Sequence, residues 1–515
     1  MDKFHSTLSR RDFMKAVGLA GAGVGAVTAA SPVFHDLDEV SQIGGVTEKR
    51  PWYVRELEYA KPTVEIDWNV IQRQTHYNNW EDHLDQAEKD KRAHMYYDNT
   101  KQMVLENNPG NTMFDVAIRH PAWTAVRRNM DYFFGVDGIQ QDTPPGFEMG
   151  FDPESGHCVI SPVWATDLFG IITPDNMGVP RWEGTPEQNA ALIRMAARWC
   201  GGAEVGYLKA DEYTKKLVHK TCGVLPILAD KNGKEVVWED VDQPYETDKK
   251  MVIPEKCNNI IVVVIREARN PALMAPSYRA DATTAKSYAR SIAFDIHFRG
   301  FIHAIGYTTA GSGWGPWNNV PFGVLSGIGE LGRMRGQITP SCGPLIRKVE
   351  VFFTDLPLPT TNPIDFGANR FCMDCGLCAK ACPASAIPTF REPTYEITPA
   401  DDANSNPTKL IPEYFNLSGK KVWPNNDFAC HNFWVTSGKH GCAACVASCV
   451  FSKDIKSSIH EVVKGVVSQT GIFNGFFANM DHAFGYGIVK DQNMWDNFWF
   501  EPDKYWPLEG IETNL

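Results

Sequence analysis

The sequence predicts an α/β or α+β core that is followed by a separate cysteine-rich domain. Residues 260–265 read IIVVVI, and an unbroken run of β-branched side chains is typical of a strand that is buried on both faces. Residues 282–305 form a long amphipathic segment, which favours a helix. Eight of the 13 cysteines lie within residues 372–449, so the cysteine-rich domain follows the core along the chain.

Length, charge and the scattered cysteines narrow the class of protein. At 515 residues the chain is long enough for two or three domains with a large buried core. Its 50 Lys and Arg residues are outnumbered by 62 Asp and Glu residues, giving a net charge of −12. This balance argues against general nucleic-acid binding, because phosphate neutralisation requires clustered basic side chains. The five cysteines outside the dense region are expected to be small buried apolar residues; they are Cys158, Cys200, Cys222, Cys257 and Cys342.

The first 42 residues resemble a twin-arginine export signal. Arg10 and Arg11 precede Asp12 and Phe13, and residues 16–30 are apolar, rich in Gly and Ala, and uncharged. This stretch is too short for a stable membrane span, which takes roughly 20 residues. We expect export of an already folded chain, with cleavage between residue 29 and about residue 42, and no other segment is apolar enough to span a membrane.

The remaining sequence divides into four parts. Residues 43–160 form a polar, aromatic-rich N-terminal region that wraps the core. Residues 161–365 form the core, in which the charged residues 209–250 are expected to be an insertion. Residues 366–455 form the cysteine domain, and residues 456–515 form an extension that packs on the core. Strands are expected at 168–172, 204–208, 260–265 and 348–354, and helices within 80–104 and at 185–199 and 282–305.

Two cysteine runs carry the most specific pattern in the sequence. The first has the spacing C-x2-C-x2-C-x3-C-P of bacterial ferredoxins, in which three thiolates hold one [4Fe–4S] cluster and the fourth cysteine holds a second cluster. The second run repeats this pattern with its first interval stretched to C-x11-C. By the same crossing we expect one cluster on Cys372, Cys375, Cys378 and Cys449, and the other on Cys382, Cys430, Cys442 and Cys445.

Two departures and two alternatives bear on this interpretation. Val450 stands where proline usually follows the last cysteine, and the loop between Cys430 and Cys442 is long, but eight ligands remain. Zinc sites would favour paired C-x2-C knuckles without the C-x3-C-P ending. Disulfides are a poorer alternative, because C-x2-C pairs would close strained loops. We therefore interpret the runs as two clusters that conduct electrons to an acceptor in the core.

A series of short motifs lies between residues 283 and 358. They are Tyr288, Gly306-Tyr307, Asn318-Asn319-Val320-Pro321, Gly327 to Arg333 (GIGELGR), Ile338-Thr339-Pro340, Gly343-Pro344, Arg347 and Thr354 to Leu358 (TDLPL). With the two cysteine runs, this series resembles the corrinoid-dependent reductive dehalogenase family. The N-terminus and the length are most similar to those of its chloroethene-respiring members. The resemblance implies a nitroreductase-like core that holds a base-off corrinoid beside the nearer [4Fe–4S] cluster.

The resemblance also implies roles for individual residues. Tyr288 is implied as the proton donor and Arg347 as the basic residue that assists it. A guanidinium beside a phenol stabilises the negative charge that remains after proton transfer. The family's asparagine is Asn319 or Asn318; we favour Asn319, which directly precedes Val-Pro, and we expect Asn318 at the cofactor. Thr284, one helical turn before Tyr288, is the other expected cofactor contact.

The implied activity is the reductive removal of halogen, as chloride, from a small organohalide such as a chlorinated ethene or ethane. This reaction is the terminal step of organohalide respiration, and the carbon–halogen bond breaks through either a cobalt–halogen contact or an organic radical. The resemblance further implies an upstream electron donor and a small integral-membrane partner. That partner would hold the enzyme on the outer face of the cytoplasmic membrane. Related enzymes include homodimers.

Two other functions share parts of the pattern. An epoxyqueuosine reductase-like enzyme would share the core and the clusters, but it acts on tRNA in the cytoplasm. The export signal and the acidic charge balance therefore count against it. A plain two-cluster electron carrier would not need the roughly 200 residues of core that precede the cysteines. Cobalt and a corrinoid spectrum would exclude the carrier.

Two further motifs are expected to mislead. Asp295-x-His297-x-x-Gly300 matches a cobalt-ligating motif, yet it lies in a predicted helix, where about 100° per residue puts His297 opposite Tyr288. The residues GIGELG at 327–332 match a dinucleotide-binding fingerprint, but no convincing strand precedes them and no acidic residue follows at the required interval. We expect a tight loop near the cofactor there.

Overall fold

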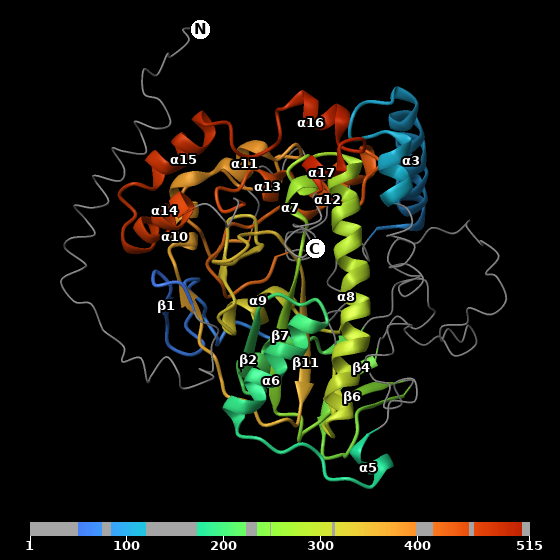
Figure 1. The fold of residues 1–515 in the computed structure, drawn as a ribbon, viewed down its shortest axis with the longest axis vertical. Helices are drawn as coiled ribbons and strands as arrows, with labels where there is room; N and C mark the ends of the chain where they lie inside the picture. Colours follow the sequence, from blue (N-terminus) through green and yellow to red (C-terminus); the bar gives the residue numbers. More distant parts are fainter. Residues whose placement is uncertain are drawn as a thin grey trace, which may run out of the picture.

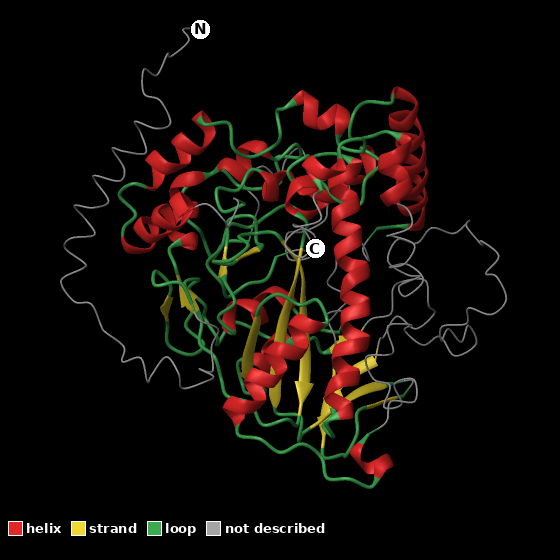
Figure 2. Ribbon diagram, in the orientation of Figure 1, coloured by secondary structure: helices red, strands yellow, loops and turns green. Residues whose placement is uncertain are grey.

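The fold is built on a four-stranded antiparallel sheet with helices on both faces (Figures 1 and 2). The strand order is β2-β7-β11-β8, and every neighbouring pair is antiparallel. Of the two classes that the sequence allows, this core therefore has the topology of α+β. In the computed structural model the described residues are 50–74, 84–119, 173–222, 234–247, 249–311, 315–397, 416–452 and 458–506. The predicted export signal and the strand predicted at 168–172 lie outside these residues.

The strands of the main sheet lie where the sequence predicts them. β7 (Asn259–Arg266) is buried along nearly its whole length, as its β-branched run requires. It pairs with β2 (Val205–Lys209) on one side and with β11 (Ile346–Thr354) on the other, so that Val262 lies opposite Val351. The short β8 (Thr309–Ala310) completes the sheet beyond β11.

Helices cover both faces of the sheet. α8 (Tyr278–Ala304) and α6 (Pro186–Trp199) pack on one face, where Phe352 joins their apolar side chains. The shorter α9 (Asn319–Leu325) packs on the other face against Phe353. The helices predicted at 185–199 and 282–305 are thus confirmed, and Figure 1 shows α8 running the length of the sheet.

The start of each long helix is set by its capping residue. Thr185 caps α6 in a capping box with Gln188, and Pro186 occupies the first helical position. Ser277 caps α8 by accepting a hydrogen bond from the backbone N–H of Ala280. α8 therefore begins four residues before the predicted boundary, because a serine cap is a stronger signal than the apolar period alone.

A second sheet fills most of the charged region that the sequence suggests is an insertion. Its strand order is β3-β4-β6-β5. Val236 and Ile253 of this sheet share one apolar core with Val262 of the main sheet. The region is therefore an integral layer beside the main sheet. The strands are β3 (Thr221–Cys222), β4 (Lys234–Glu239), β5 (Tyr245–Glu246) and β6 (Lys250–Pro254).

The N-terminal region contacts the end of the core and the cysteine domain. β1 (Arg55–Glu56) pairs with β12 (Ile364–Asp365), immediately before the first cysteine run. α3 (Gln86–Glu106) packs on α12 (Asp427–Thr436), which carries Cys430. The helix predicted within 80–104 begins later than its first residue, because Asp85 caps it.

The cysteine domain and the C-terminal extension form the helical half of the molecule at the top of Figure 1. The extension packs on the cysteine domain through α14 and α15, and on the start of α8 through α16 and α17. None of the described helices combines the length and the apolar character that a membrane-spanning helix requires. The helices are α10 (Ala368–Cys375), α11 (Leu377–Ala381), α13 (Ala444–Ala447), α14 (Ser458–Gln469), α15 (Asn474–Ala483), α16 (Gln492–Asn497) and α17 (Pro502–Tyr505). The remaining elements are α5 (Pro174–Met177), η4 (Thr214–Leu217), α7 (Arg269–Ala272), β9 (Glu330–Leu331) and β10 (Gln337–Ile338).

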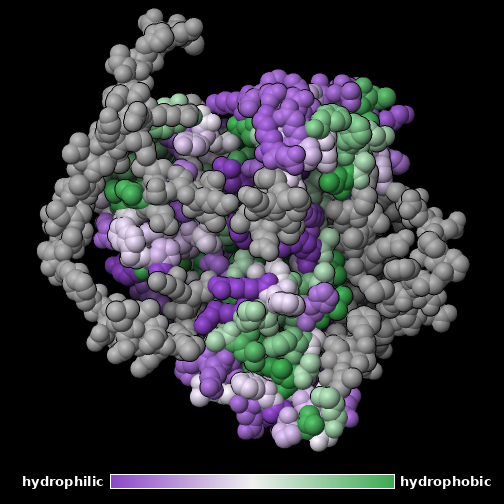
Figure 3. All heavy atoms as spheres, viewed as in Figure 1, coloured by the Kyte–Doolittle hydropathy of each residue, from purple (hydrophilic) through white to green (hydrophobic). Residues whose placement is uncertain are grey.

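Apolar side chains also gather on the outer surface over α6 (Figure 3). Met195 is 61% and Trp199 is 84% exposed, on the side of α6 that faces away from the sheet. Ile193 and Ala197 of the same helix are fully buried against the core. Contacts within the described part of the chain therefore account for only the inner face of this helix.

Candidate active site and thiol clusters

The structure brings Tyr288 and Arg347 together between α8 and β11. The guanidinium carbon of Arg347 lies 4.8 Å from the centroid of the Tyr288 ring. The contact depends on a β-bulge, because Ile346 pairs with Arg266 and Lys348 pairs with Ile265, which leaves Arg347 as the extra residue. A bulge changes the direction of the side chain at the extra residue, and bulges recur beside active sites for this reason. Both residues are half-buried.

A buried carboxyl group, that of Glu267, lies near this pair. Glu267 follows β7 directly, is 3% exposed and accepts a hydrogen bond of 2.6 Å from the Thr284 hydroxyl. Burial raises the pKa of Glu267, and the charge of Arg347 opposes that rise. Burial lowers the pKa of Arg347, but its interactions with Tyr288 and Glu267 outweigh this effect and raise the pKa overall. The guanidinium therefore stays charged between an acid and a phenol.

The eight cysteines of the two runs fall into two sets of four, which match the predicted crossing. The first set encloses a small cavity lined also by Arg333 and Phe371. No three His, Cys, Asp or Glu side chains among the described residues converge as a single metal ion requires. Four thiols around a cavity suit a cluster of several atoms. The first set is Cys372, Cys375, Cys378 and Cys449.

The second thiol set neighbours both the first set and the active-site pair. Cys378 of the first set is close enough to Cys445 of the second for their charges to interact. Cys445 in turn interacts with Arg347. Burial raises the pKa of Cys442 to about 12 and that of Cys445 to about 11, so at neutral pH these thiols lose their protons only when a metal binds the sulfur. The second set is Cys382, Cys430, Cys442 and Cys445.

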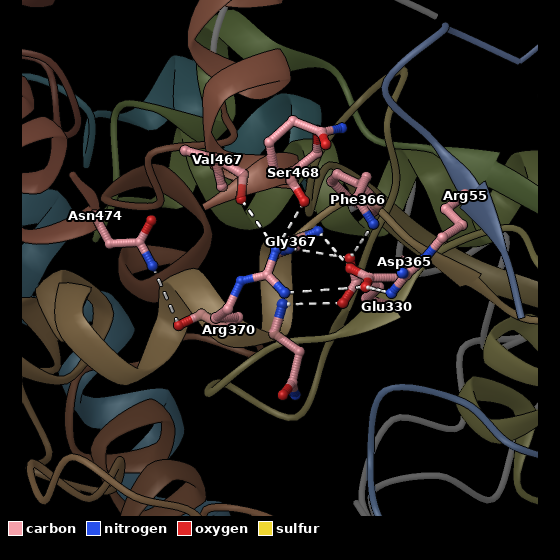
Figure 4. A network of polar contacts seen from close by, with 12 residues as sticks. Arg55, Glu330, Asp365, Phe366, Gly367, Arg370, Val467, Ser468 and Asn474 are labelled. Atoms are coloured by element: carbon pink, nitrogen blue, oxygen red, sulfur yellow. Dashed lines mark hydrogen bonds and ion pairs between the residues drawn. The ribbon is translucent and has the colours of Figure 1, made fainter. Parts of the chain in front are cut away.

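The helix that carries Cys372 and Cys375 is anchored from three sides (Figure 4). Glu330 of β9 accepts hydrogen bonds of 2.7–3.2 Å from three backbone N–H groups where α10 begins. Asp365 accepts a 2.7 Å bond from Arg55, and Arg370 donates to the end of α14. A carboxylate at a helix N-terminus satisfies otherwise unpaired N–H groups. The position of the first thiol set is therefore fixed by the core, the N-terminal region and the C-terminal extension together.

Two residues of the GIGELGR segment at 327–333 anchor α10. This role accounts for the segment that resembles a dinucleotide-binding fingerprint, with no need for a bound dinucleotide. Glu330 holds the start of α10, and Arg333 donates to the backbone carbonyls of Cys372 and Phe390. The guanidinium of Arg333 also lies over the Trp423 ring, 4.6 Å from its centroid. Burial lowers the pKa of Arg333, and the neighbouring thiols oppose that change. The sequence predicts a tight loop near the cofactor at this position, but it does not predict the anchoring roles of Glu330 and Arg333.

A large cavity opens on the α9 side of the sheet. Its volume is about 660 Å3, within the range of about 300–1,000 Å3 that is typical of ligand sites. Asn318 and Asn319 both line it, and Asn319 also donates a 2.7 Å hydrogen bond to the carbonyl of Val349. Tyr288, Arg347 and Thr284 are not among the described lining residues. The charged side chains that line it are all cationic: Arg73, Lys216, Lys220, Arg335 and Lys420.

The two remaining predictions concern residues away from these sites. His297 is exposed on α8, whereas Tyr288 faces β11, so the two side chains point in different directions as predicted. Cys257 and Cys342 are buried and Cys200 is half-buried. Cys158 and the side chain of Cys222 lie outside the described residues.

An acid–base pair, two sets of four thiols and a cofactor-sized cavity in one chain point to an oxidoreductase. Comparison with known proteins then identifies the family. The family profile described as "Reductive dehalogenase subunit" matches residues 49–358, more than half of the chain. This protein belongs to the reductive dehalogenase family.

Individual relatives agree with this assignment. A chloroethene reductive dehalogenase of Dehalococcoides mccartyi strain VS is 32% identical, with 99% of each chain covered. A trichloroethene reductive dehalogenase of a second Dehalococcoides mccartyi strain is 29% identical, with both chains fully covered. A tetrachloroethene reductive dehalogenase of Sulfurospirillum multivorans is 34% identical over 60% of each chain.

Solved structures support the same fold. The catabolic reductive dehalogenase NpRdhA, solved in complex with 3-bromo-4-hydroxybenzoic acid, superposes with a TM-score of 0.55 at 18% identity. The match covers 88% of this chain and 53% of that one, so the chain spans about half the length of this structural relative. At this identity the likeness concerns the fold alone.

Proposed function

We propose that this protein removes chlorine from a chlorinated ethene by corrinoid-dependent reductive dehalogenation, using two [4Fe–4S] clusters. The observation that carries the proposal is a series of neighbouring groups that leads from the first thiol set to Tyr288. The first thiol set interacts with the second through Cys378 and Cys445, and Cys445 interacts with Arg347 beside Tyr288. The relatives that match over nearly the full length are named for chloroethene and trichloroethene.

The residues of the site fit the proposed groups. Each set of four thiols offers the ligand number of one [4Fe–4S] cluster. The 660 Å3 cavity, with cationic and amide side chains on its wall, suits a large cofactor that carries amides and a phosphate. A bound corrinoid would supply the low-potential cobalt that cleaves the carbon–halogen bond. Asn318 and Asn319 would hold it from the α9 side of the sheet, whereas Tyr288 and Arg347 lie between α8 and β11, outside the described lining of this cavity.

The protein's own residues would then manage the proton. Tyr288 is the donor, because its hydroxyl is the acid beside a permanently charged guanidinium. Arg347 stabilises the phenolate that remains, and the nearby carboxyl group of Glu267, which accepts a hydrogen bond from Thr284, interacts with the charge of Arg347. Half-burial of the pair limits the access of water and strengthens these interactions.

We also propose export by the twin-arginine route and residence on the outer face of the cytoplasmic membrane. Arg10 and Arg11, followed by an uncharged apolar stretch, support export. A small integral-membrane subunit would anchor the enzyme, an upstream donor would reduce its clusters, and a homodimer is compatible with the family. Membrane fractionation with and without Arg10→Lys/Arg11→Lys tests the export step, with retention in the cytoplasm as the expected result.

One assay tests the proposed activity. Protein reconstituted anaerobically with iron, sulfide and corrinoid is incubated with a strong reductant and a panel of chlorinated ethenes and ethanes. We expect chloride release that depends on the reductant and on the corrinoid, and that is fastest with an ethene. Protein that holds its full iron and sulfide, yet neither contains nor takes up a corrinoid, would overturn the proposal.

A further inference from the structure

One face of α8 carries a row of polar side chains, of which all but Tyr288 are buried against the sheet. Ser291 and Arg299 are fully buried, and Asp295 is 6% exposed. Positions three and four residues apart share one face of a helix, so the row runs in register along α8. Buried charges are stable only when other charges or hydrogen bonds compensate them. The row consists of Thr284, Tyr288, Ser291, Asp295, Arg299 and His303.

Strand β11 supplies the groups that compensate this row. The fully buried Glu350 accepts a hydrogen bond from the Ser291 hydroxyl. Arg299 donates two hydrogen bonds to Asp295, at 2.7 and 3.2 Å. The amine of Lys348 interacts with both carboxyl groups, Glu350 and Asp295, and lies 5.8 Å from the centroid of the Tyr288 ring. Lys348 therefore connects the proposed proton donor to a buried pair of acids.

The proposed reaction needs such a connection. One organohalide, two electrons and one proton give one dehalogenated product and one halide ion, so Tyr288 becomes a phenolate once per turnover. The phenolate must regain a proton before the next turnover. Arg347 is the nearest cation, but a guanidinium does not release its proton at working pH. The proton must come from another group.

We propose that Lys348 returns the proton to Tyr288 after each turnover, while Glu350 and Asp295 hold its amine in position. An N–H bond of the Lys348 ammonium breaks, the O–H bond of Tyr288 forms, and the neutral amine then takes up a proton from solvent. The Lys348 amine is a neighbour of the Tyr288 ring, 5.8 Å from its centroid, and a proton can pass between two such neighbouring groups through one water molecule. This inference rests on the proposed function and adds the route of its proton.

The charges around Lys348 suit this role. Burial lowers the pKa of Lys348 to about 8, Glu350 and Asp295 raise it, and Arg347 lowers it. An ammonium with this pKa is mostly protonated at neutral pH and still transfers its proton readily to a phenolate. The titratable groups that face Lys348 in the described part of the chain include Arg347 and Glu350 on β11, and Tyr288 and Asp295 on α8.

Two substitutions distinguish whether Lys348 acts as a proton donor or only as a fixed positive charge. Lys348→Met removes the proton and the charge, whereas Lys348→Arg keeps the charge but cannot release the proton. In the reconstituted, reduced enzyme we expect both variants to complete the first turnover at the wild-type rate, because Tyr288 begins protonated. Steady-state kcat should then fall by about 10²-fold or more in both variants, with little change in KM. Lys286→Met is the matched control, because Lys286 lies on α8 over Trp506. It should behave as wild type.

The outcomes are distinct. A Lys348→Arg enzyme that keeps half or more of the wild-type steady-state rate would show that only the charge matters and overturn the inference. An equal loss in the first and later turnovers of both variants would also overturn it. A wild-type enzyme that releases no halide would instead remove the proposed function, and the inference with it.

A second measurement needs neither cofactor nor turnover. Lysines of the unloaded protein are methylated with a carbon-13 label, and the Lys348 resonance is assigned by its absence in Lys348→Arg. We expect this resonance to titrate near pH 8, and at a lower pH in Glu350→Gln, because the Glu350 charge raises the pKa of Lys348. A Lys348 resonance that titrates near the ordinary ~10.4 would overturn the inference.

Discussion

Arg347 lies over the ring of Tyr288 with its guanidinium carbon 4.8 Å from the ring centroid, and a one-residue bulge in β11 makes this contact. The two residues come from different elements, separated by 58 residues of sequence that include α9 and three short strands. Neither α8 nor β11 alone brings Arg347 to Tyr288. The contact depends on the pairing of β11 with β7, because the register shift that makes Arg347 the extra residue of the bulge exists only relative to β7.

Tyr288→Phe should abolish most of the activity while leaving the protein intact. Removal of a general acid typically lowers the rate about 10²–10⁴-fold. Chloride release should fall by this factor, with iron, sulfide and corrinoid contents unchanged. Tyr307→Phe is a suitable control, because the Tyr307 hydroxyl donates to the Trp182 carbonyl at the far end of α8. Undiminished turnover in Tyr288→Phe would mean that another group donates the proton.

Glu267→Gln should weaken the positioning of Arg347. The amide can still accept the hydrogen bond from Thr284, but it lacks the charge that faces the guanidinium. We expect kcat to fall about tenfold, equivalent to about 1.4 kcal/mol, with a smaller effect on KM. Steady-state kinetics of Glu267→Gln and Thr284→Val measure this, and unchanged kcat in both variants would exclude a role for this contact.

Pairs of cysteine substitutions should reveal the crossing of the two runs. Each single substitution to alanine is expected to remove about half of the bound iron, because four ligands hold one cluster. Cys372→Ala with Cys449→Ala should lose no more than either single variant, since both side chains line one cavity. Cys430→Ala with Cys449→Ala should lose nearly all of the iron. Iron analysis and electron paramagnetic resonance distinguish these results, and the reverse pattern would contradict the crossing.

His303 should make folding stability sensitive to mild acid. Burial, together with the charge of Arg299, lowers the pKa of His303 to about 4 from an ordinary value of about 6.5. Between these pH values the unfolded chain binds a proton that the folded chain does not, so stability falls as pH drops from about 6.5 to about 4. In His303→Gln this fall should be smaller, as measured by urea unfolding at pH 7, 6 and 5.

The control for this measurement is His297→Gln, which changes an exposed side chain of the same helix. We expect it to keep the acid sensitivity of the wild type. An identical pH dependence in His303→Gln and wild type would show that His303 does not contribute.

The elements with strong local signals were predictable from sequence. The β-branched run gave β7, the apolar period with a Thr-Pro start gave α6, and the cysteine spacing gave the two thiol sets that the structure brings together. Each of these signals is contained within a few neighbouring residues. Where the signal lies within a few neighbouring residues, the sequence alone is enough to predict the element or the set of ligands.

Other features depended on partners far along the chain. The bulge at Arg347 needs the register of β7, and the role of Glu267 needs the approach of α8. The anchoring by Glu330 and Arg333 could be suspected only because a charged pair interrupts a glycine-rich stretch. Burial of such charges is a property of the folded molecule, so the sequence predicted the loop but not its purpose.

The pairing of β1 with β12 has a consequence for how the chain is made. Arg55 meets Asp365 across 310 residues of sequence, so the contact cannot form until most of the polypeptide has left the ribosome. At a synthesis rate of about 5–20 residues per second, this interval lasts roughly 15–60 s. Throughout it, β1 lacks the strand with which it pairs in the folded protein. The β1–β12 contact therefore forms late in synthesis, and a chaperone that binds unfolded segments would have ample time to act on the N-terminal region.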